Sequence, residues 1–285
     1  REVNRVVREA KVAFYTGKIK ENTDNKTVFK LAKTLFHKNK SATLPTHEDP
    51  KELADKFAHY FKDKIDKIRQ SFPTTVSAPV HNASSTSPEL SQFKSILPEE
   101  LRKVIMSGNS KSCSLDPVPT TLLKACIDNL LPALTSIVNL SLHSSTFPSH
   151  FKQAVVTPLI KKPSLDAETL SNYRPVSNLS YVGKLIERVV VGQLKEHMNE
   201  HSLHRPLQSA YRSHHSTETA LLKVVNDIHL AIDNKQFVYL VMLDLSAAFD
   251  TVNHDVLLER LQSDFGMQDC VLAWLKSYFS DRVQS

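Results

Sequence analysis

The apolar run at 237–243, Phe-Val-Tyr-Leu-Val-Met-Leu, is the feature that most constrains the fold. It leads directly into Asp244, and a second carboxylate, Asp250, follows Phe249. An uninterrupted run of this kind predicts a strand that is buried on both faces. Burying a carboxylate at its end is costly unless a positive group compensates. We therefore expect Asp244 at the rim of a sheet, next to a cation.

Composition is consistent with a folded protein that lies within a cell. The 285 residues are 41% hydrophobic, enough for one large domain or two small ones. No apolar run approaches the roughly 20 residues of a membrane span, so we expect no membrane partner. The chain opens without a start methionine, signal peptide or targeting helix, which predicts an intracellular chain that begins mid-protein. Cys113, Cys126 and Cys270 are too scattered for a disulfide framework or zinc knuckle.

Charge is distributed unevenly along the chain. Residues 1–40 carry eleven Lys and Arg against four Asp and Glu, whereas residues 236–285 carry three against seven. The basic end suits a phosphate backbone, and a solvated helical arm explains it equally well. The acidic end could hold metal.

The chain order predicts an α+β protein in three parts: a basic helical region at 1–70, a Ser/Thr/Pro-rich linker at 71–92, and a mixed domain at 93–285. Asp49 and Asn253 are expected helix caps, and Gly266 is an expected terminator. Helices are expected at 2–20, 26–38, 49–70, 98–106, 119–145 (broken at Pro132), 181–201, 216–235, 254–264 and through 269–282. Strands are expected at 151–162 and 237–243.

Asp244 is the principal candidate for chemistry. A strand fixes the position of its last side chain, and the loop that follows gives access to it. Mg²⁺ prefers oxygen ligands, usually one or two carboxylates with phosphates and waters. Two-metal phosphoryl transfer needs at least one more carboxylate from elsewhere in the protein. The alternative is an aspartate that caps the turn after the strand.

The residues after Asp244 suit a nucleotide. Ser246, Ala247 and Ala248 are small, so a ligand can approach the backbone closely. Phe249 could form the wall of a sugar pocket and exclude a ribose 2′-hydroxyl. A phenylalanine that packs in the core is the alternative. Asp250 suits a turn as well as a ligand set.

Four blocks in series resemble the reverse transcriptases of non-LTR (LINE-type) retrotransposons, especially the jockey and chicken-repeat clades. "LDLSAAFDTVNHDVLLERL" resembles their first catalytic block. Outside these four blocks, residues 1–70 resemble the basic region between the endonuclease and the polymerase of the full-length elements. The other matching blocks are "KSCSLDPVPTTLLK" (111–124), "FKQAVVTPLIKK" (151–162) with "SNYRPVSNLSYVGKLIERVV" (171–190), and "QSAYRSHHSTETALL" (208–222).

The resemblance implies the fingers and the start of the palm of a right-hand polymerase. It matches Asp244 to the first catalytic, metal-binding aspartate, with Leu245 lending a backbone carbonyl to a metal. It matches Phe249 to the position that discriminates dNTP from rNTP, with Ala248 beside it. It further implies Mg²⁺, an RNA template, a DNA primer and dNTPs, in the cytoplasm and nucleus.

Basic residues of these blocks are expected to meet phosphates. Arg174 and Lys162 are candidates for the nucleotide, and Arg212 and Lys161 for the template strand. A guanidinium offers bidentate geometry and an ammonium a point charge. Each of the four could instead be a surface salt-bridge partner.

Two family blocks do not occur in this sequence: the Gly-Val-Pro-Gln-Gly stretch and the Ala-Asp-Asp hairpin that carries the remaining catalytic carboxylates. We therefore expect the isolated chain to hold Mg²⁺ poorly and not to polymerise by itself. The rival hypothesis is an inactive nucleic-acid-binding or interaction module, a decayed or host-adopted relic. A further alternative is a palm that does not fold stably alone.

Histidines and aromatic residues offer weaker signals. The pair His214 and His215 has no cysteine or carboxylate at zinc-ligand spacing, and His254 is expected to begin a helix. Trp274 and Tyr278 have core-like helical spacing, which favours packing over base stacking.

Overall fold

The computed structural model describes residues 2–21, 44–72 and 88–285. Helices dominate these ranges and a three-stranded sheet accompanies them, which confirms the predicted α+β class. The chain divides into two compact units, Arg1–Ala54 with Pro158–Arg174, and Asp55–Thr157 with Pro175–Ser285. No helix in the described ranges is long and apolar enough to cross a membrane.

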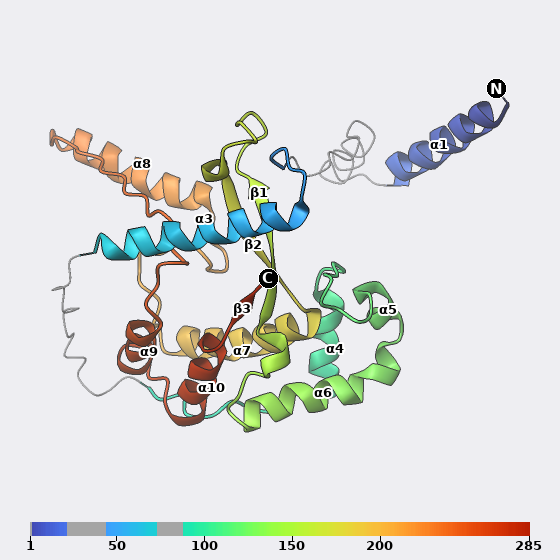
Figure 1. Cartoon of the computed structure of the whole chain (residues 1–285). Coiled ribbons are helices and arrows are strands. Elements are labelled where there is room, and N and C mark those ends of the chain that lie inside the picture. Colours follow the sequence, from blue (N-terminus) through green and yellow to red (C-terminus); the bar gives the residue numbers. More distant parts are fainter. Residues whose placement is uncertain (1, 22–43, 73–87) are drawn as a thin grey trace. The chain divides into compact units, whose positions relative to one another are not determined.

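Figure 1 shows the elements in chain order. The helices are α1 (Glu2–Glu21), α3 (Pro50–Gln70), α4 (Pro98–Ser107), α5 (Thr120–Ala125), α6 (Ile127–His143), α7 (Tyr181–Glu200), α8 (Thr217–Asp233), α9 (His254–Ser263) and α10 (Asp269–Phe279), with 3-10 turns at Ser149–Phe151 and Leu170–Asn172. The strands are β1 (Gln153–Ile160), β2 (Tyr173–Leu179) and β3 (Val283–Gln284). The helix predicted at 26–38 and most of the linker predicted at 71–92 lie outside the described residues.

Side-chain caps begin several of these helices where the sequence predicted. Asp49 Oδ1 accepts a hydrogen bond from the N–H of Lys51 at 2.8 Å, before α3. Asn253 Oδ1 accepts from the N–H groups of Asp255 and Val256 at 2.9 and 3.2 Å, before α9. Such caps satisfy N–H groups that have no partner within the helix. The start of α9 at His254 is therefore confirmed.

The break predicted at Pro132 is wrong. The helices α5 and α6 separate at Cys126, whose φ of −102° and ψ of 23° leave the helical range, and Pro132 lies inside α6. A proline there removes the N–H that would bond to the carbonyl of Asp128. The helix continues because α6 buries one face, including Leu131 and Leu134, and this packing outweighs the lost bond.

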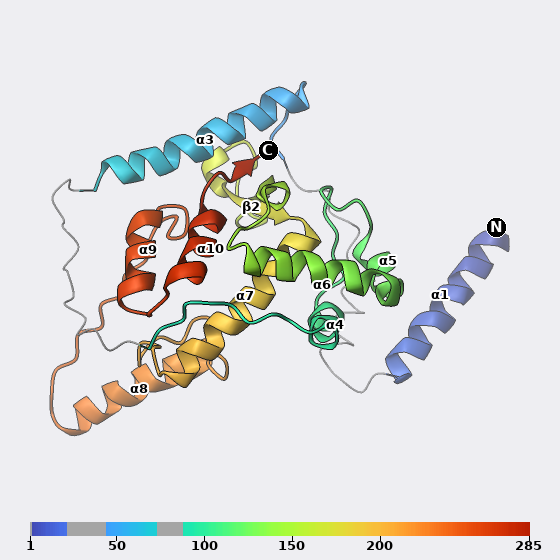
Figure 2. The same cartoon turned by 90° about the horizontal axis from the view of Figure 1, so that it is seen from below.

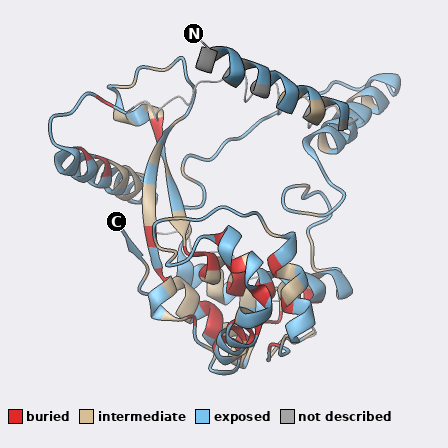
Figure 3. Ribbon diagram, turned by 90° about the vertical axis from the view of Figure 1, so that its right-hand side faces the viewer, coloured by how far each residue is buried: buried red, intermediate tan, exposed pale blue. Residues whose placement is uncertain are grey.

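The core of the second unit forms around Trp274, which is 1% exposed. Helices α4, α6 and α7 pack against one another, and α10 packs against α9 (Figures 1 and 2). Rings of Phe93 and Phe147 meet the indole edge-on at 5.9 and 5.6 Å between centroids, and Tyr278 stacks on it at 5.4 Å. Figure 3 shows the buried residues gathered among these helices. Trp274 therefore packs in the core, as its spacing predicted.

The sheet has the strand order β2-β1-β3. β3 runs parallel to β1, with Gln153 opposite Val283 and Ala154 opposite Gln284. The N–H of Ser285 donates to the carbonyl of Ala154 at 2.9 Å and extends this pairing. Because β3 follows α10 closely, the helical core also holds the end of the sheet.

The strand predicted at 237–243 is wrong in this structure. These residues have no strand assignment, and Phe237, Tyr239 and Leu243 are 96%, 91% and 89% exposed. A strand forms only where a neighbour pairs with its N–H and C=O groups. Within the described residues none of the three strands does so for this segment.

Gly266 occupies a position that other residues would strain. Its φ is +67°, and a Cβ there would lie 2.0 Å from the carbonyl oxygen of Pro88. The carbonyl of Gly266 also accepts from the N–H of Leu90 at 2.8 Å, so the two backbones approach closely. Glycine suits this position because it has no Cβ and tolerates positive φ.

Gly266→Ala should therefore destabilise the protein. The left-handed conformation alone costs an L-residue about 1–2 kcal/mol, and relief of the overlap with Pro88 adds to that loss. Gly192→Ala is the matched control, because nothing lies within 4 Å of its added Cβ on α7. The control should be neutral or stabilising by up to about 1 kcal/mol. Urea unfolding midpoints measure both, and equal midpoints for the two variants would contradict this account.

Candidate active site

The segment that carries Asp244 is exposed. Asp244 and Asp250 are exposed, and Leu245 and Phe249 are each 75% exposed. A tight turn follows, in which the carbonyl of Ala247 accepts from the N–H groups of Asp250 and Thr251 at 3.0 and 3.1 Å. This turn presents the Phe249 ring to the surface.

Two oxygen groups at this segment are of the kind that a hard cation prefers. A carboxylate from Asp244 and a carbonyl from Leu245 are both oxygen ligands, as a hard cation requires. Across 2–21, 44–72 and 88–285, however, no three His, Cys, Asp or Glu side chains form a group that could hold a metal ion.

Arg212 braces the loop that carries it. Its Nη1 donates to the carbonyls of Arg205 and Gln208 at 3.3 and 3.1 Å. The N–H of Gln208 also donates to the carbonyl of Arg205 at 3.1 Å, and its side chain donates to the carbonyl of Ala210 at 3.3 Å. We call residues 205–212 the braced loop. Its conformation is fixed largely by bonds within itself.

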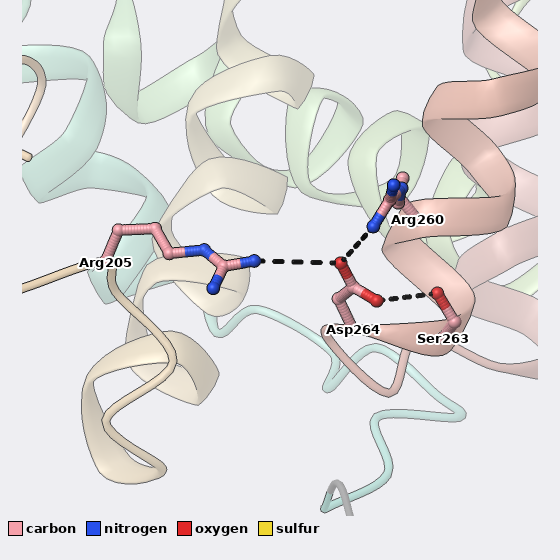
Figure 4. A network of polar contacts seen from close by, with 4 residues as sticks. All are labelled: Arg205, Arg260, Ser263 and Asp264. Atoms are coloured by element: carbon pink, nitrogen blue, oxygen red, sulfur yellow. Dashed lines mark hydrogen bonds and ion pairs between the residues drawn. The ribbon is translucent and has the colours of Figure 1, made fainter. Parts of the chain in front are cut away.

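An ionic network ties the braced loop to the end of α9 (Figure 4). The carboxylate of Asp264, 16% exposed, receives a hydrogen bond from Arg260 Nη1 at 3.2 Å and lies 4.0 Å from Arg205 Nη2. Ser263 Oγ donates to its other oxygen at 2.8 Å. Because Asp264 is half-buried and shared by two guanidinium groups, it anchors the first residue of the loop to a folded helix.

The braced loop brings an aromatic residue to Phe249. The rings of Tyr211 and Phe249 meet edge-on, with centroids 6.2 Å apart and planes at 75°. Tyr211 is 76% exposed and has a φ of 62°. The sequence prediction chose Arg212 from this block and missed its neighbour. The available signal was an aromatic residue beside an arginine, Tyr-Arg, in a polar loop.

The first unit holds the other predicted cations. Lys161, Lys162 and Arg174 are all exposed. The backbone N–H of Lys161 donates to the carbonyl of Asn172, and its Nζ donates to the carbonyl of Ser171, both at 2.8 Å. Lys161 therefore also closes the loop between β1 and β2.

A pocket of about 510 Å³ lies beside the turn that follows Phe249. The end of α3 contributes Arg69, whose Nη2 donates to the carbonyl of Asp250 at 3.3 Å. The lining residues are Arg69, Phe72, Thr251, Val252, Asn253, His254 and Asp255. The C-terminal end of α3 thus contacts the turn that follows Phe249.

The family model for reverse transcriptase (RNA-dependent DNA polymerase) matches residues 160–285. This range contains the exposed aspartate, the aromatic turn and the braced loop described above. This part of the chain belongs to the reverse transcriptase family. The predicted resemblance to reverse transcriptases is therefore confirmed for the blocks within this range, at 171–190, 208–222 and 243–261.

Similar proteins come from Drosophila transposons. The probable RNA-directed DNA polymerase from transposon BS of Drosophila melanogaster is 33% identical over 191 residues, which is 67% of this chain and 21% of that protein. The RNA-directed DNA polymerase from mobile element jockey of the same species is 30% identical over 156 residues, 55% of this chain and 17% of that protein. The chain thus spans about a fifth of the length of these relatives.

Asp264→Ala should loosen the braced loop of the reverse transcriptase. Without the carboxylate, Arg205 loses its anchor and the loop opens more often. Limited trypsin digestion should cleave after Arg212 severalfold faster, since a partly exposed ion pair contributes at most about 1 kcal/mol. Asp227→Ala is the control, because it removes the exposed pair with Lys223 on α8. An unchanged rate in Asp264→Ala would show that the network does not hold the loop.

Proposed function

We propose that the chain forms the fingers and the start of the palm of an RNA-directed DNA polymerase, which copies RNA into DNA from a primer at nicked DNA. The observation that carries this proposal is the family match across 160–285, which includes Asp244 and Phe249 in "LDLSAAFD". RNA template, DNA primer and dNTPs are the proposed partners.

Asp244 is the proposed catalytic carboxylate and a ligand of Mg²⁺, with the carbonyl of Leu245 as a second oxygen donor. The exposed position of this segment leaves the carboxylate accessible to an ion and to further ligands. Mg²⁺ suits this donor type because it is bound through one or two carboxylates together with substrate phosphates. Two-metal phosphoryl transfer needs at least one more carboxylate besides Asp244.

Phe249 is the proposed sugar-selecting residue. Its ring is presented by the turn at Ala247, and Ala248 beside it leaves room for the nucleotide backbone to approach. A bulky ring at that place disfavours a 2′-hydroxyl by steric exclusion. The turn geometry supports this assignment because it holds the ring outward rather than in the core.

The basic residues are proposed phosphate contacts, Lys162 and Arg174 for the nucleotide and Lys161 and Arg212 for the template. Arg212 has five N–H donors, and the two bonds that brace its loop use only Nη1. The same guanidinium can therefore hold the loop and bind a phosphate. Arg174 is exposed on β2, where a strand limits its motion.

The test of this function is Asp244→Asn in a joined polymerase, made by fusing residues 1–285 to the segment that follows the matched region in the transposon BS relative. Loss of this charge should lower Mg²⁺-dependent primer extension on RNA by at least about a hundredfold, because charge stabilisation in phosphoryl transfer contributes several kcal/mol. Asparagine keeps the shape of the side chain. Asp227→Asn, on α8, should leave extension unchanged. Wild-type rates for Asp244→Asn would refute the assignment.

Nucleic-acid binding gives a separate test on the chain itself. Arg174→Ala should weaken binding of an RNA–DNA hybrid and reduce the slope of log K against log salt by about 0.7–0.9, the value for one lost phosphate contact. Lys223→Ala, which removes a cation paired with Asp227, is the control. Fluorescence anisotropy across a salt series measures both slopes. An identical slope for Arg174→Ala and wild type would remove Arg174 from the phosphate contacts.

A further inference from the structure

We propose that Tyr211 is a specificity-determining residue of the nucleotide site, which sets the orientation of the Phe249 ring and forms a second wall of the sugar pocket. This inference rests on the proposed function of Phe249. It concerns a residue of the block before the catalytic one.

The first support is the contact itself. Tyr211 and Phe249 meet edge-on at 6.2 Å between centroids, which is within the preferred range for an aromatic pair. Both rings are about three-quarters exposed, so neither is held by burial. Two exposed rings from segments almost forty positions apart in the sequence are therefore in contact at the protein surface, and one of them is Phe249, the proposed sugar-selecting residue.

The second support is the backbone on either side of this contact. Tyr211 has a φ of 62° and Ala247, in the turn that presents Phe249, has a φ of 51°. The left-handed region is unfavourable for residues other than glycine, and especially for a bulky one. Strain of this kind persists only where surrounding interactions impose it, and it concentrates at ligand sites.

The third support is the pair of anchors that impose this geometry. Arg212, the next residue, braces the loop through the carbonyls of Arg205 and Gln208. Asp264 ties Arg205 to the end of α9 (Figure 4). A mobile surface loop would not hold an exposed ring at a fixed angle to another. These contacts fix the backbone of the loop that carries Tyr211, and the ring itself contacts Phe249.

Phe249 and Tyr211 have different roles in this proposal. Phe249 meets the sugar, and Tyr211 limits how far the Phe249 ring can turn away. Loss of the Tyr211 ring should therefore admit a 2′-hydroxyl without removing a group needed for bond formation. The contact uses the ring edge and face, so the phenolic hydroxyl is not required.

The contact is tested in the chain of residues 1–285 with 4-fluorophenylalanine at position 249. Tyr211→Ala should shift the fluorine resonance, whereas Tyr211→Phe should leave it nearly unchanged. Leu207→Ala is the matched control, because Leu207 is 81% exposed in the same loop. The same resonance in Tyr211→Ala and Leu207→Ala would overturn the inference, whatever the activity of the polymerase.

Specificity is tested in the joined polymerase as the ratio of kcat/KM for a dNTP to that for the matching rNTP. Tyr211→Ala should lower this ratio about tenfold, at the low end of the effect of one lost pocket contact, with Tyr211→Phe and Leu207→Ala close to wild type. A ratio that Tyr211→Ala leaves unchanged, while Asp244→Asn abolishes extension, overturns this inference alone. Extension that survives Asp244→Asn instead overturns the proposed function on which the inference rests.

Discussion

Burial of the Trp274 indole holds together the elements on which the candidate site depends. Its Nε1 donates a hydrogen bond to Ser141 Oγ on α6 at 3.0 Å. Ser141 Oγ in turn donates to the carbonyl of Thr146 at 2.7 Å. Leaving a buried N–H of this kind without a partner would cost about 1–3 kcal/mol. Phe93 and Phe147 close around the same ring from two other parts of the chain. Because α9 packs against α10, this core also fixes the helix end that anchors the braced loop.

Local chemistry made the helices predictable. The caps at Asp49 and Asn253 act between residues two or three positions apart, so the sequence contains the whole interaction. The terminator at Gly266 was predictable from its type, although the close approach of Pro88 that makes it necessary was not. Pro132 shows the limit of a local rule. Proline is unfavourable inside a helix, yet α6 continues past Pro132 because the packing of its buried face stabilises it.

The run at 237–243 shows what periodicity leaves open. Its apolar composition favours a strand that is buried on both faces. A strand, however, also needs neighbouring strands to pair with, and those come from distant parts of the sequence. In the described structure the three paired strands are elsewhere, and the run stays unpaired and exposed. The prediction that Asp244 lies at the rim of a sheet is therefore wrong in this structure, because the segment before it pairs with none of the three strands. Exposure of so much apolar surface is typical of an interaction site.

A charged residue near a motif can bind a phosphate or can hold its own loop in shape through bonds to backbone carbonyls. The structure distinguishes these two roles better than the sequence does. Arg212 and Lys161 were chosen because cations suit phosphates, yet both donate to backbone carbonyls and shape their own loops. A loop shaped in this way can present a neighbour that chemistry alone would not select. Tyr211 is such a neighbour, since its only sequence signal is adjacency to Arg212. Its position beside Phe249 follows from two local features, the brace and the turn at Ala247, together with one tertiary contact, the anchor at Asp264. Hydrophobic periodicity reveals none of them, because the two local features depend on individual side chains and backbone angles, and the contact with Asp264 joins residues 59 positions apart.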